Sequence, residues 1–78
     1  MTIKYIEYSF ITATNHEYII EIDSIDQLEE KILSALHLKT NSGKIIYNEE
    51  KINGSCYWIM NTPFGNMACR FGELQVIK

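Results

Sequence analysis

The sequence predicts a single α+β domain over residues 1–78, an antiparallel sheet of four to five strands in the order β-β-α-β-β-β packed on one face by a single amphipathic helix. Two stretches rich in β-branched and aromatic residues, 3–22 and 44–61, are each interrupted by a turn sequence. Between them, residues 24–37 carry apolar side chains at helical spacing. Because short antiparallel connections need no crossover, one helix covering one face is the economical arrangement.

The first hairpin is expected from 3–14 and 17–22, with Asn15-His16 as a two-residue loop. In that register Ile11 lies opposite Ile20. One face of the hairpin then carries Ile11, Ala13, Tyr18, Ile20 and Ile22. The other face carries Ile6, Tyr8, Phe10 and Ile19. Both faces are apolar enough to need cover.

The helix is expected to begin after Ser24, because this hydroxyl cap is followed three residues later by Gln27, as in a capping box. The apolar positions that follow describe three to four turns of an amphipathic helix: Ile25, Leu28, Ile32, Leu33, Ala35 and Leu36. The helix should end within 37–39, because residues 40–43 supply turn formers and a left-handed position.

The second hairpin is expected to turn at Asn53-Gly54, the strongest short hairpin signal in the chain. This turn gives the pairs Ile52 with Ser55, Glu49 with Trp58, and Tyr47 with Met60. The face predicted to pack on the helix contains Ile45, Tyr47, Cys56, Trp58 and Met60.

The last strand pattern follows a turn at 62–66 and has Met67, Cys69 and Phe71 in alternation. Gly72 suggests a bulge, after which 73–77 is expected to finish as an edge strand.

Two registers remain open for this strand. One places Cys56 opposite Cys69, where a disulfide is sterically conceivable, and the other places Trp58 opposite Cys69. Two cysteines are too few for a secreted disulfide scaffold, so reduced thiols are the expectation.

Composition excludes several classes of function. Seven Lys and Arg against ten Asp and Glu give a formal charge of −3, and the cations are scattered, which disfavours direct nucleic-acid binding. The four glycines are isolated, so there is no phosphate-binding loop. No cysteine and histidine spacing fits a metal site, and no cofactor is indicated. The absence of a signal peptide or membrane span predicts a cytoplasmic protein.

Acidic residues are concentrated around the start of the helix: Glu17, Glu21, Asp23, Asp26, Glu29 and Glu30. The ordinary interpretation is a solvated helix face with favourable first-turn charges. The functional interpretation is an acidic surface that engages a basic site on a protein partner or imitates nucleic acid there.

An apolar outer sheet face is also expected, because one helix covers only one side. Residues expected to remain partly uncovered are Ile6, Tyr8, Phe10, Ile19, Ile46, Tyr57 and Ile59. Such a patch indicates a protein partner or a homodimer, unless loops and long polar side chains shield it.

No catalytic residues are predicted. His16 falls in an expected turn and His37 at a helix end, both common positions for a solvated histidine. A cysteine–histidine pair that meets in space stays open, and a concave pocket holding two such side chains would favour a small enzyme.

In general character the chain resembles the small phage-encoded anti-CRISPR proteins, acidic α+β domains without an enzymatic motif. Ile3-Lys4-Tyr5 and the segment from Asp23 to Glu29 look like short stretches of a type I anti-CRISPR and cover about a tenth of the chain. The element order departs from it, because strands continue after the helix here. The resemblance implies binding by surface complementarity, with acidic groups covering the nucleic-acid-binding surface of a Cas complex or nuclease.

The first functional hypothesis is therefore a non-enzymatic, phage or mobile-element inhibitor of a bacterial defence or nucleic-acid-processing complex. An immunity protein or antitoxin that neutralises a cognate toxin is the alternative, and a small enzyme or ligand-binding subunit is the second alternative. The predicted partner-binding residues are Tyr8, Phe10, Glu21, Asp23, Asp26, Glu29 and Glu30.

Overall fold

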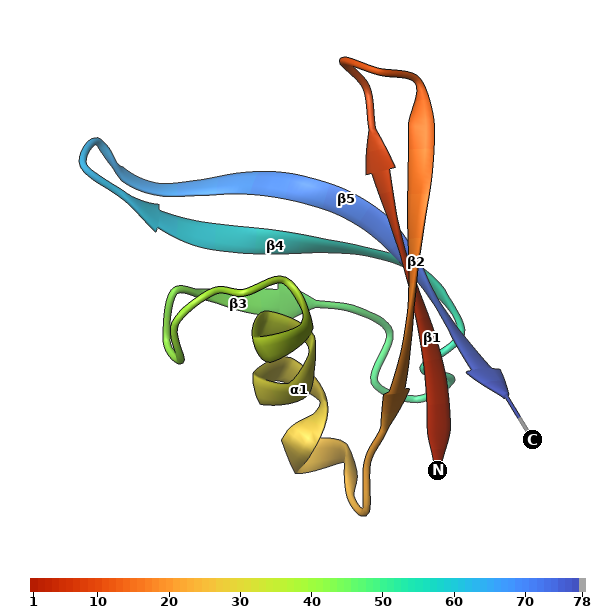
Figure 1. Cartoon of the computed structure of the whole chain (residues 1–78). Helices are drawn as coiled ribbons and strands as arrows, with labels where there is room; N and C mark the ends of the chain where they lie inside the picture. Colours follow the sequence, from red (N-terminus) through yellow and green to blue (C-terminus); the bar gives the residue numbers. More distant parts are fainter. Residues whose placement is uncertain (78) are drawn as a thin grey trace.

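The computed structural model describes residues 1–77 and shows a five-stranded antiparallel sheet with one short helix (Figure 1). Its elements, in chain order, are β1 (Thr2–Ser9), β2 (Thr14–Glu21), a 3₁₀ turn (Ile25–Gln27), α1 (Leu28–Ala35), β3 (Gly43–Ile46), β4 (Gly54–Thr62) and β5 (Gly65–Ile77). The order across the sheet is β2-β1-β5-β4-β3. The predicted fold class, element order and single helix are confirmed.

The hydrophobic core lies between α1 and one face of the sheet. Its fully buried side chains come from β1, α1, β4 and β5: Ile3, Tyr5, Leu28, Ile32, Leu33, Trp58 and Leu74. The predicted helix-packed face is confirmed, because Ile45, Cys56 and Trp58 are buried and Tyr47 and Met60 pack against them. Among residues 1–77 no helix lies over the opposite face of the sheet, which we call the outer face (Figure 1).

The register predicted for the first hairpin is wrong. The turn lies at residues 10–13 rather than at Asn15-His16, so Ile20 pairs with Ile3 and not with Ile11. The observed register places Ile3 and Tyr5 in the core, whereas Ile11 is 98% exposed at the tip. Burial of two large side chains stabilises the hairpin by more than the preference of an Asn-His turn can.

The register predicted for the second hairpin is wrong as well, by four residues. Ile45 lies opposite Trp58, and residues 47–53 form a longer connection instead of a two-residue turn. Asn53 serves another purpose there, because its side-chain oxygen accepts the backbone N–H of Val76 at 2.6 Å. Since a shift of four residues preserves the side-chain alternation, the predicted face survived although the predicted pairs did not.

β5 is the central strand in the order of the sheet. The sequence predicted an edge strand for 73–77, and that prediction is wrong. Residues Gly72–Ile77 of β5 pair with β1, and Gly65–Leu74 pair with β4. A bulge is present beside Gly72, as predicted, with Arg70 at a φ of 54°. The extra residue changes the alternation, so that Phe71 points to the outer face instead of sharing the core face with Met67 and Cys69.

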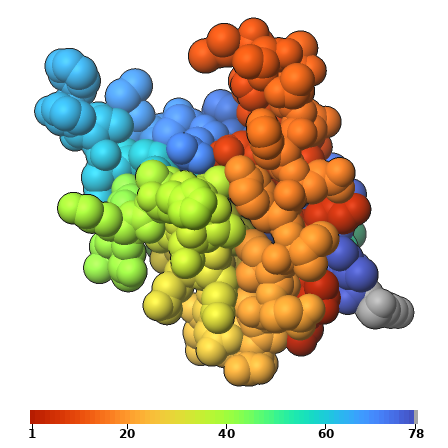
Figure 2. Space-filling view, in the orientation of Figure 1, coloured from red at the N-terminus to blue at the C-terminus, as the bar shows by residue number. Residues whose placement is uncertain are grey.

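Beyond the bulge, the two hairpins of the sheet diverge. The pairing of β1 with β5 ends at Glu7 and Gly72. Past this point the β1–β2 hairpin and the β4–β5 hairpin run in different directions, and their tips project from the body of the molecule (Figures 1 and 2).

The helical segment follows Ser24 as predicted, but the capping differs. The Ser24 hydroxyl makes no capping bond, whereas the Gln27 side chain accepts the backbone N–H of Asp23 at 2.7 Å. The α-helix ends at Ala35, before the predicted 37–39. His37 takes a φ of 60°, and the Leu38 N–H donates to the Leu33 carbonyl at 2.9 Å, which closes a Schellman motif.

Cys69 lies opposite Trp58, the second of the two registers left open by the sequence. Both cysteines are free, so the disulfide conceivable in the other register does not form.

Candidate binding surfaces

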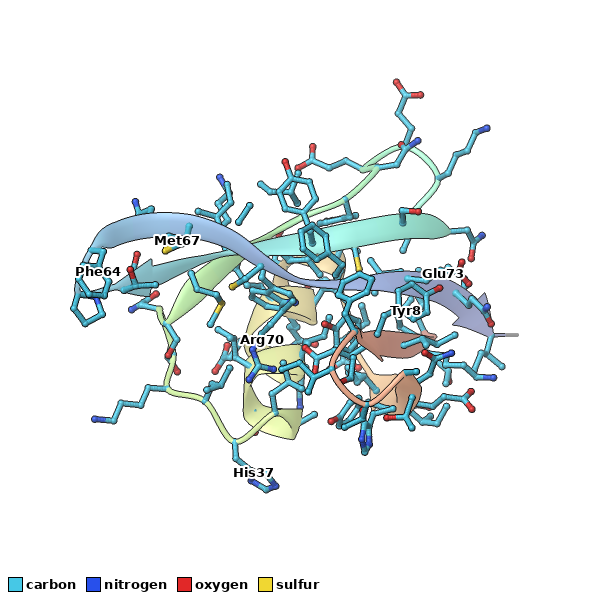
Figure 3. All side chains as sticks on the ribbon, turned by 90° about the horizontal axis from the view of Figure 1, so that it is seen from above. Tyr8, His37, Phe64, Met67, Arg70 and Glu73 are labelled. Atoms are coloured by element: carbon cyan, nitrogen blue, oxygen red, sulfur yellow. The ribbon has the colours of Figure 1, made fainter. Side chains whose placement is uncertain are left out.

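Tyr8 and Phe10, the two aromatic members of the predicted partner-binding set, do not lie beside the acidic start of the helix. Tyr8 points to the outer face, where its hydroxyl donates to Glu73 at 3.5 Å, and the two side chains lie close together in Figure 3. Burial and the neighbouring Glu73 carboxylate raise the pKa of Tyr8. Phe10 is 77% exposed in the β1–β2 turn. The predicted composite site is thus divided between two surfaces.

The five predicted acidic residues do form one stretch of surface, from the end of β2 to the first turn of α1. Glu21 accepts a hydrogen bond from the Thr2 hydroxyl, whereas Asp23, Asp26 and Glu30 are exposed. Within residues 1–77 the ion pairs are those of Lys4 with Glu17 and of Arg70 with Glu7. None of the five carboxylates is therefore neutralised by an ion pair of the described chain.

A groove between α1 and β3 concentrates part of this charge. It has a volume of about 480 Å³ and is lined by Ile25, Asp26, Leu28, Glu29, Lys44, Ile45, Tyr47 and Glu49. We call it the acidic groove. Three carboxylates against a single lysine give it a negative balance, while aliphatic and aromatic side chains form the rest of its walls.

Glu29 has a structural role in this groove. Its Oε1 atom accepts the backbone N–H of Ile45 at 2.9 Å, which ties the helix to the free edge of β3. Burial raises the pKa of Tyr47, and the charges of Glu49, Glu29 and Asp26 raise it further. Asp26, Glu29 and Glu49 all line the groove together with Tyr47, so the three carboxylates face the same space.

Sequence reasoning missed Glu49, Lys44 and Tyr47 as groove residues. The predicted register made Glu49 a strand residue opposite Trp58, whereas it lies in the 47–53 connection. The groove exists because α1 packs beside β3, and no local sequence pattern reports that juxtaposition.

The outer face is incompletely covered, as predicted, and it mixes apolar residues with charged ones, among them Lys4, Glu17 and Glu73. Its seven predicted residues are all half-buried or exposed: Ile6, Tyr8, Phe10, Ile19, Ile46, Tyr57 and Ile59. The bulge adds Phe71, whose ring centroid lies 6.0 Å from that of Phe10 and 6.2 Å from that of Tyr57. These three rings join the two diverging hairpins on the outer face.

A hydrogen-bond chain joins the same hairpins on the core side. The Trp58 indole N–H donates to the Tyr5 hydroxyl at 3.2 Å, and that hydroxyl donates to Glu7 at 3.3 Å. Glu7 in turn accepts both contacts of the Arg70 guanidinium, at 2.9 and 3.2 Å. Burial, followed by the Glu7 charge, raises the pKa of Tyr5. Each of these polar side chains therefore has a hydrogen-bond partner within the protein, which is a structural role.

The residues considered for catalysis lie apart. His16 lines a shallow groove of about 400 Å³ with Glu7 and Arg70, and His37 is exposed at the end of α1 (Figure 3). Cys56 is buried, and burial raises the pKa of its thiol to about 12. Neither cysteine lines that groove, and no cluster of potential metal ligands occurs among the residues that the structure covers.

Among residues 1–77 no helix has the length and apolar character needed to cross a membrane. Comparison of the chain with protein-family models, curated proteins and solved structures found no match.

Proposed function

We propose that this protein is a non-catalytic, protein-binding inhibitor, encoded by a phage or mobile element, that blocks a bacterial defence or nucleic-acid-processing complex. The observation that carries the proposal is the acidic groove, together with the carboxylates beside it that no ion pair neutralises. The anti-CRISPR-like character of the sequence suggests a Cas complex as the target.

The chemistry of the groove favours a basic side chain. Lysine and arginine have long aliphatic stems and cationic heads, so they match a cavity with apolar walls and carboxylates at its rim. The Tyr47 ring offers an additional face for a guanidinium group. Protein surfaces that bind nucleic acid are rich in these same cations, and a partner seated on them excludes the nucleic acid.

The proposal revises the predicted contact set. Asp23, Asp26 and Glu30 remain available for a partner, whereas Glu29 already bonds the backbone of β3. Tyr8 and Phe10 fall outside this contact, because they belong to the outer face and its hairpin tip.

The test is a phage infection assay in cells that carry an active type I CRISPR system. Expression of the chain should raise plaque formation by a targeted phage to the level of cells without the system. Asp26→Lys should reduce this effect, and Glu50→Lys is the matched control, since Glu50 is exposed outside the groove and its reversal changes the net charge equally.

Binding kinetics with the purified target distinguish the proposed contact from a general charge effect. Asp26→Lys should weaken binding through the association rate and make it less sensitive to salt. If both charge reversals act equally, or if neither acts, the groove is not the contact. Full interference in cells that express the wild-type chain would exclude this type I complex as the target.

A further inference from the structure

One long strand edge of the sheet has no partner within the described chain. β5 pairs with β1 only from Gly72 onward, so Gly65–Phe71 is paired on the β4 side alone. The Asn61 N–H donates to Ser42 at 3.0 Å, away from β5, so its cross-strand partner Asn66 directs its own N–H and C=O to the free edge. By the same alternation, the backbone groups of Ala68 point there too.

This edge lacks the protection of the other two. β3 is four residues long, and the Ile45 N–H at its outer edge is bonded by Glu29. β2 carries Glu17 and Glu21 along its length. Charged side chains, short length and covered amides are the usual means by which a sheet edge avoids pairing with another strand. By contrast, residues 65–69 are uncharged, and all of them except Cys69 are exposed.

Exposed apolar side chains lie at both ends of this edge. At the tip of the β4–β5 hairpin, Phe64 is 93% exposed and Met67 is 52% exposed; Figure 3 shows both at that end of the molecule. At the other end, where the hairpins diverge, Phe10 and Phe71 are 77% and 42% exposed and contact each other. The edge is therefore uncharged at its centre and aromatic at both ends.

We propose that this edge binds a second copy of the chain, with the two β5 strands antiparallel about a two-fold axis near Ala68. The outward N–H and C=O groups of each β5 strand would hydrogen-bond with those of the other. The antiparallel register brings Phe64 of one copy to the level of residues 70–72 of the other, beside its Phe10 and Phe71 rings. The charge distribution also permits this contact, because residues 65–69, which lie around the axis, carry no charge.

The inference goes beyond the proposed inhibitory function and stands independently of it. It uses the β5 edge, whereas the acidic groove lies between α1 and β3. A dimer formed at this edge would present two acidic grooves.

Sedimentation velocity of the full chain over a range of concentrations tests the proposal. The wild-type chain should show a monomer–dimer equilibrium. Ala68→Lys, which sets two lysines against each other across the axis, should weaken association at least about tenfold. Ser34→Lys is the control, because it adds the same charge at an exposed position on α1, away from the β5 edge. It should leave association unchanged.

A second pair of variants keeps the test independent of charge and folding. Phe64→Ser should weaken the dimer while circular dichroism stays that of the wild type, since the side chain is almost fully exposed. In a Cys69→Ser background, Ala68→Cys should form an intermolecular disulfide on mild oxidation, because residues opposite each other on antiparallel strands lie within disulfide reach. A wild-type chain that stays monomeric, or an Ala68→Lys variant that dimerises normally, overturns the proposal.

Discussion

Gly72→Ala should be among the most damaging substitutions in this chain. Gly72 is buried between β1 and β4, opposite Glu7 on one side and Cys56 on the other. A Cβ atom added there would lie 2.1 Å from the Ile6 carbonyl oxygen and 3.2 Å from Cε1 of Tyr5. The close neighbour is backbone, so β1 must move by more than about 1 Å to reach an ordinary contact distance.

The magnitude follows from two contributions. Overpacking a well-packed core typically costs about 1–3 kcal/mol, and weakening one or two ladder hydrogen bonds costs about 1 kcal/mol each. The sum is about 4 kcal/mol. Since a domain of this size is stable by roughly 4–12 kcal/mol, the variant should lose about a third or more of its free energy of unfolding.

Urea unfolding followed by circular dichroism measures this loss. Gly65→Ala is the control, because its Cβ would meet no atom within 4 Å and the substitution only strains a φ of +109°. That strain should cost about 1–2 kcal/mol. A Gly72→Ala variant no less stable than Gly65→Ala would refute the close approach of β1 and β5 at this position.

Three further predictions concern the core and the helix end. Trp58→Phe removes the indole donor to Tyr5 and leaves a small void, so the free energy of unfolding should fall by about 2 kcal/mol in urea titrations. His37→Gly should raise it by about 1 kcal/mol, because glycine adopts the positive φ of this position without steric strain. The Cys56 thiol, with a pKa raised to about 12 by burial, should react with iodoacetamide at pH 8 at least about tenfold more slowly in the native than in the urea-unfolded chain. Equal rates in the two states would contradict its burial.

The same pKa shift fixes a pH dependence. Because the folded-state pKa of Cys56 lies above the ordinary value of 9.0, the folded state favours the neutral thiol. This contribution to stability is complete below pH 9 and is lost as the pH rises toward 12. Cys56→Ala should reduce the alkaline loss of stability between these values, measured as the unfolding midpoint in urea at each pH.

The sequence predicted elements and faces better than it predicted registers. Side-chain alternation along β4 placed Cys56 and Trp58 on the helix-packed face, because that pattern depends only on neighbouring positions. The pairing of Ile45 with Trp58 instead leaves residues 47–53 as a connection, in which Asn53 bonds Val76, 23 positions away in the sequence. Turn propensity at Asn53-Gly54 could not anticipate it.

The central place of β5 was also beyond local reasoning. Residues 73–77 were predicted as a final edge strand, yet all of them pair with β1, and Glu73 and Leu74 pair with β4 as well. This placement buries Leu74 and brings Arg70 to Glu7 across 63 positions of sequence. These contacts depend on tertiary packing, so no periodic pattern in the sequence reveals them.

The candidate site, too, was predicted where it depends on local sequence and missed where it depends on tertiary packing. The acidic residues at the start of the helix were visible as a local concentration of charge. Their separation from Tyr8 and Phe10, and the addition of Glu49 to Asp26 and Glu29, followed only from how α1 lies against the sheet.

Carboxyl footprinting of the chain bound to its inhibited target tests the central claim most directly. Carbodiimide labelling, read by mass spectrometry, compares each carboxylate in the free and bound chain. Asp26 and Glu49 in the acidic groove should be protected by the target, while Glu50 outside it should label equally in both states. Unchanged labelling of Asp26 and Glu49 in the complex would contradict binding through this groove.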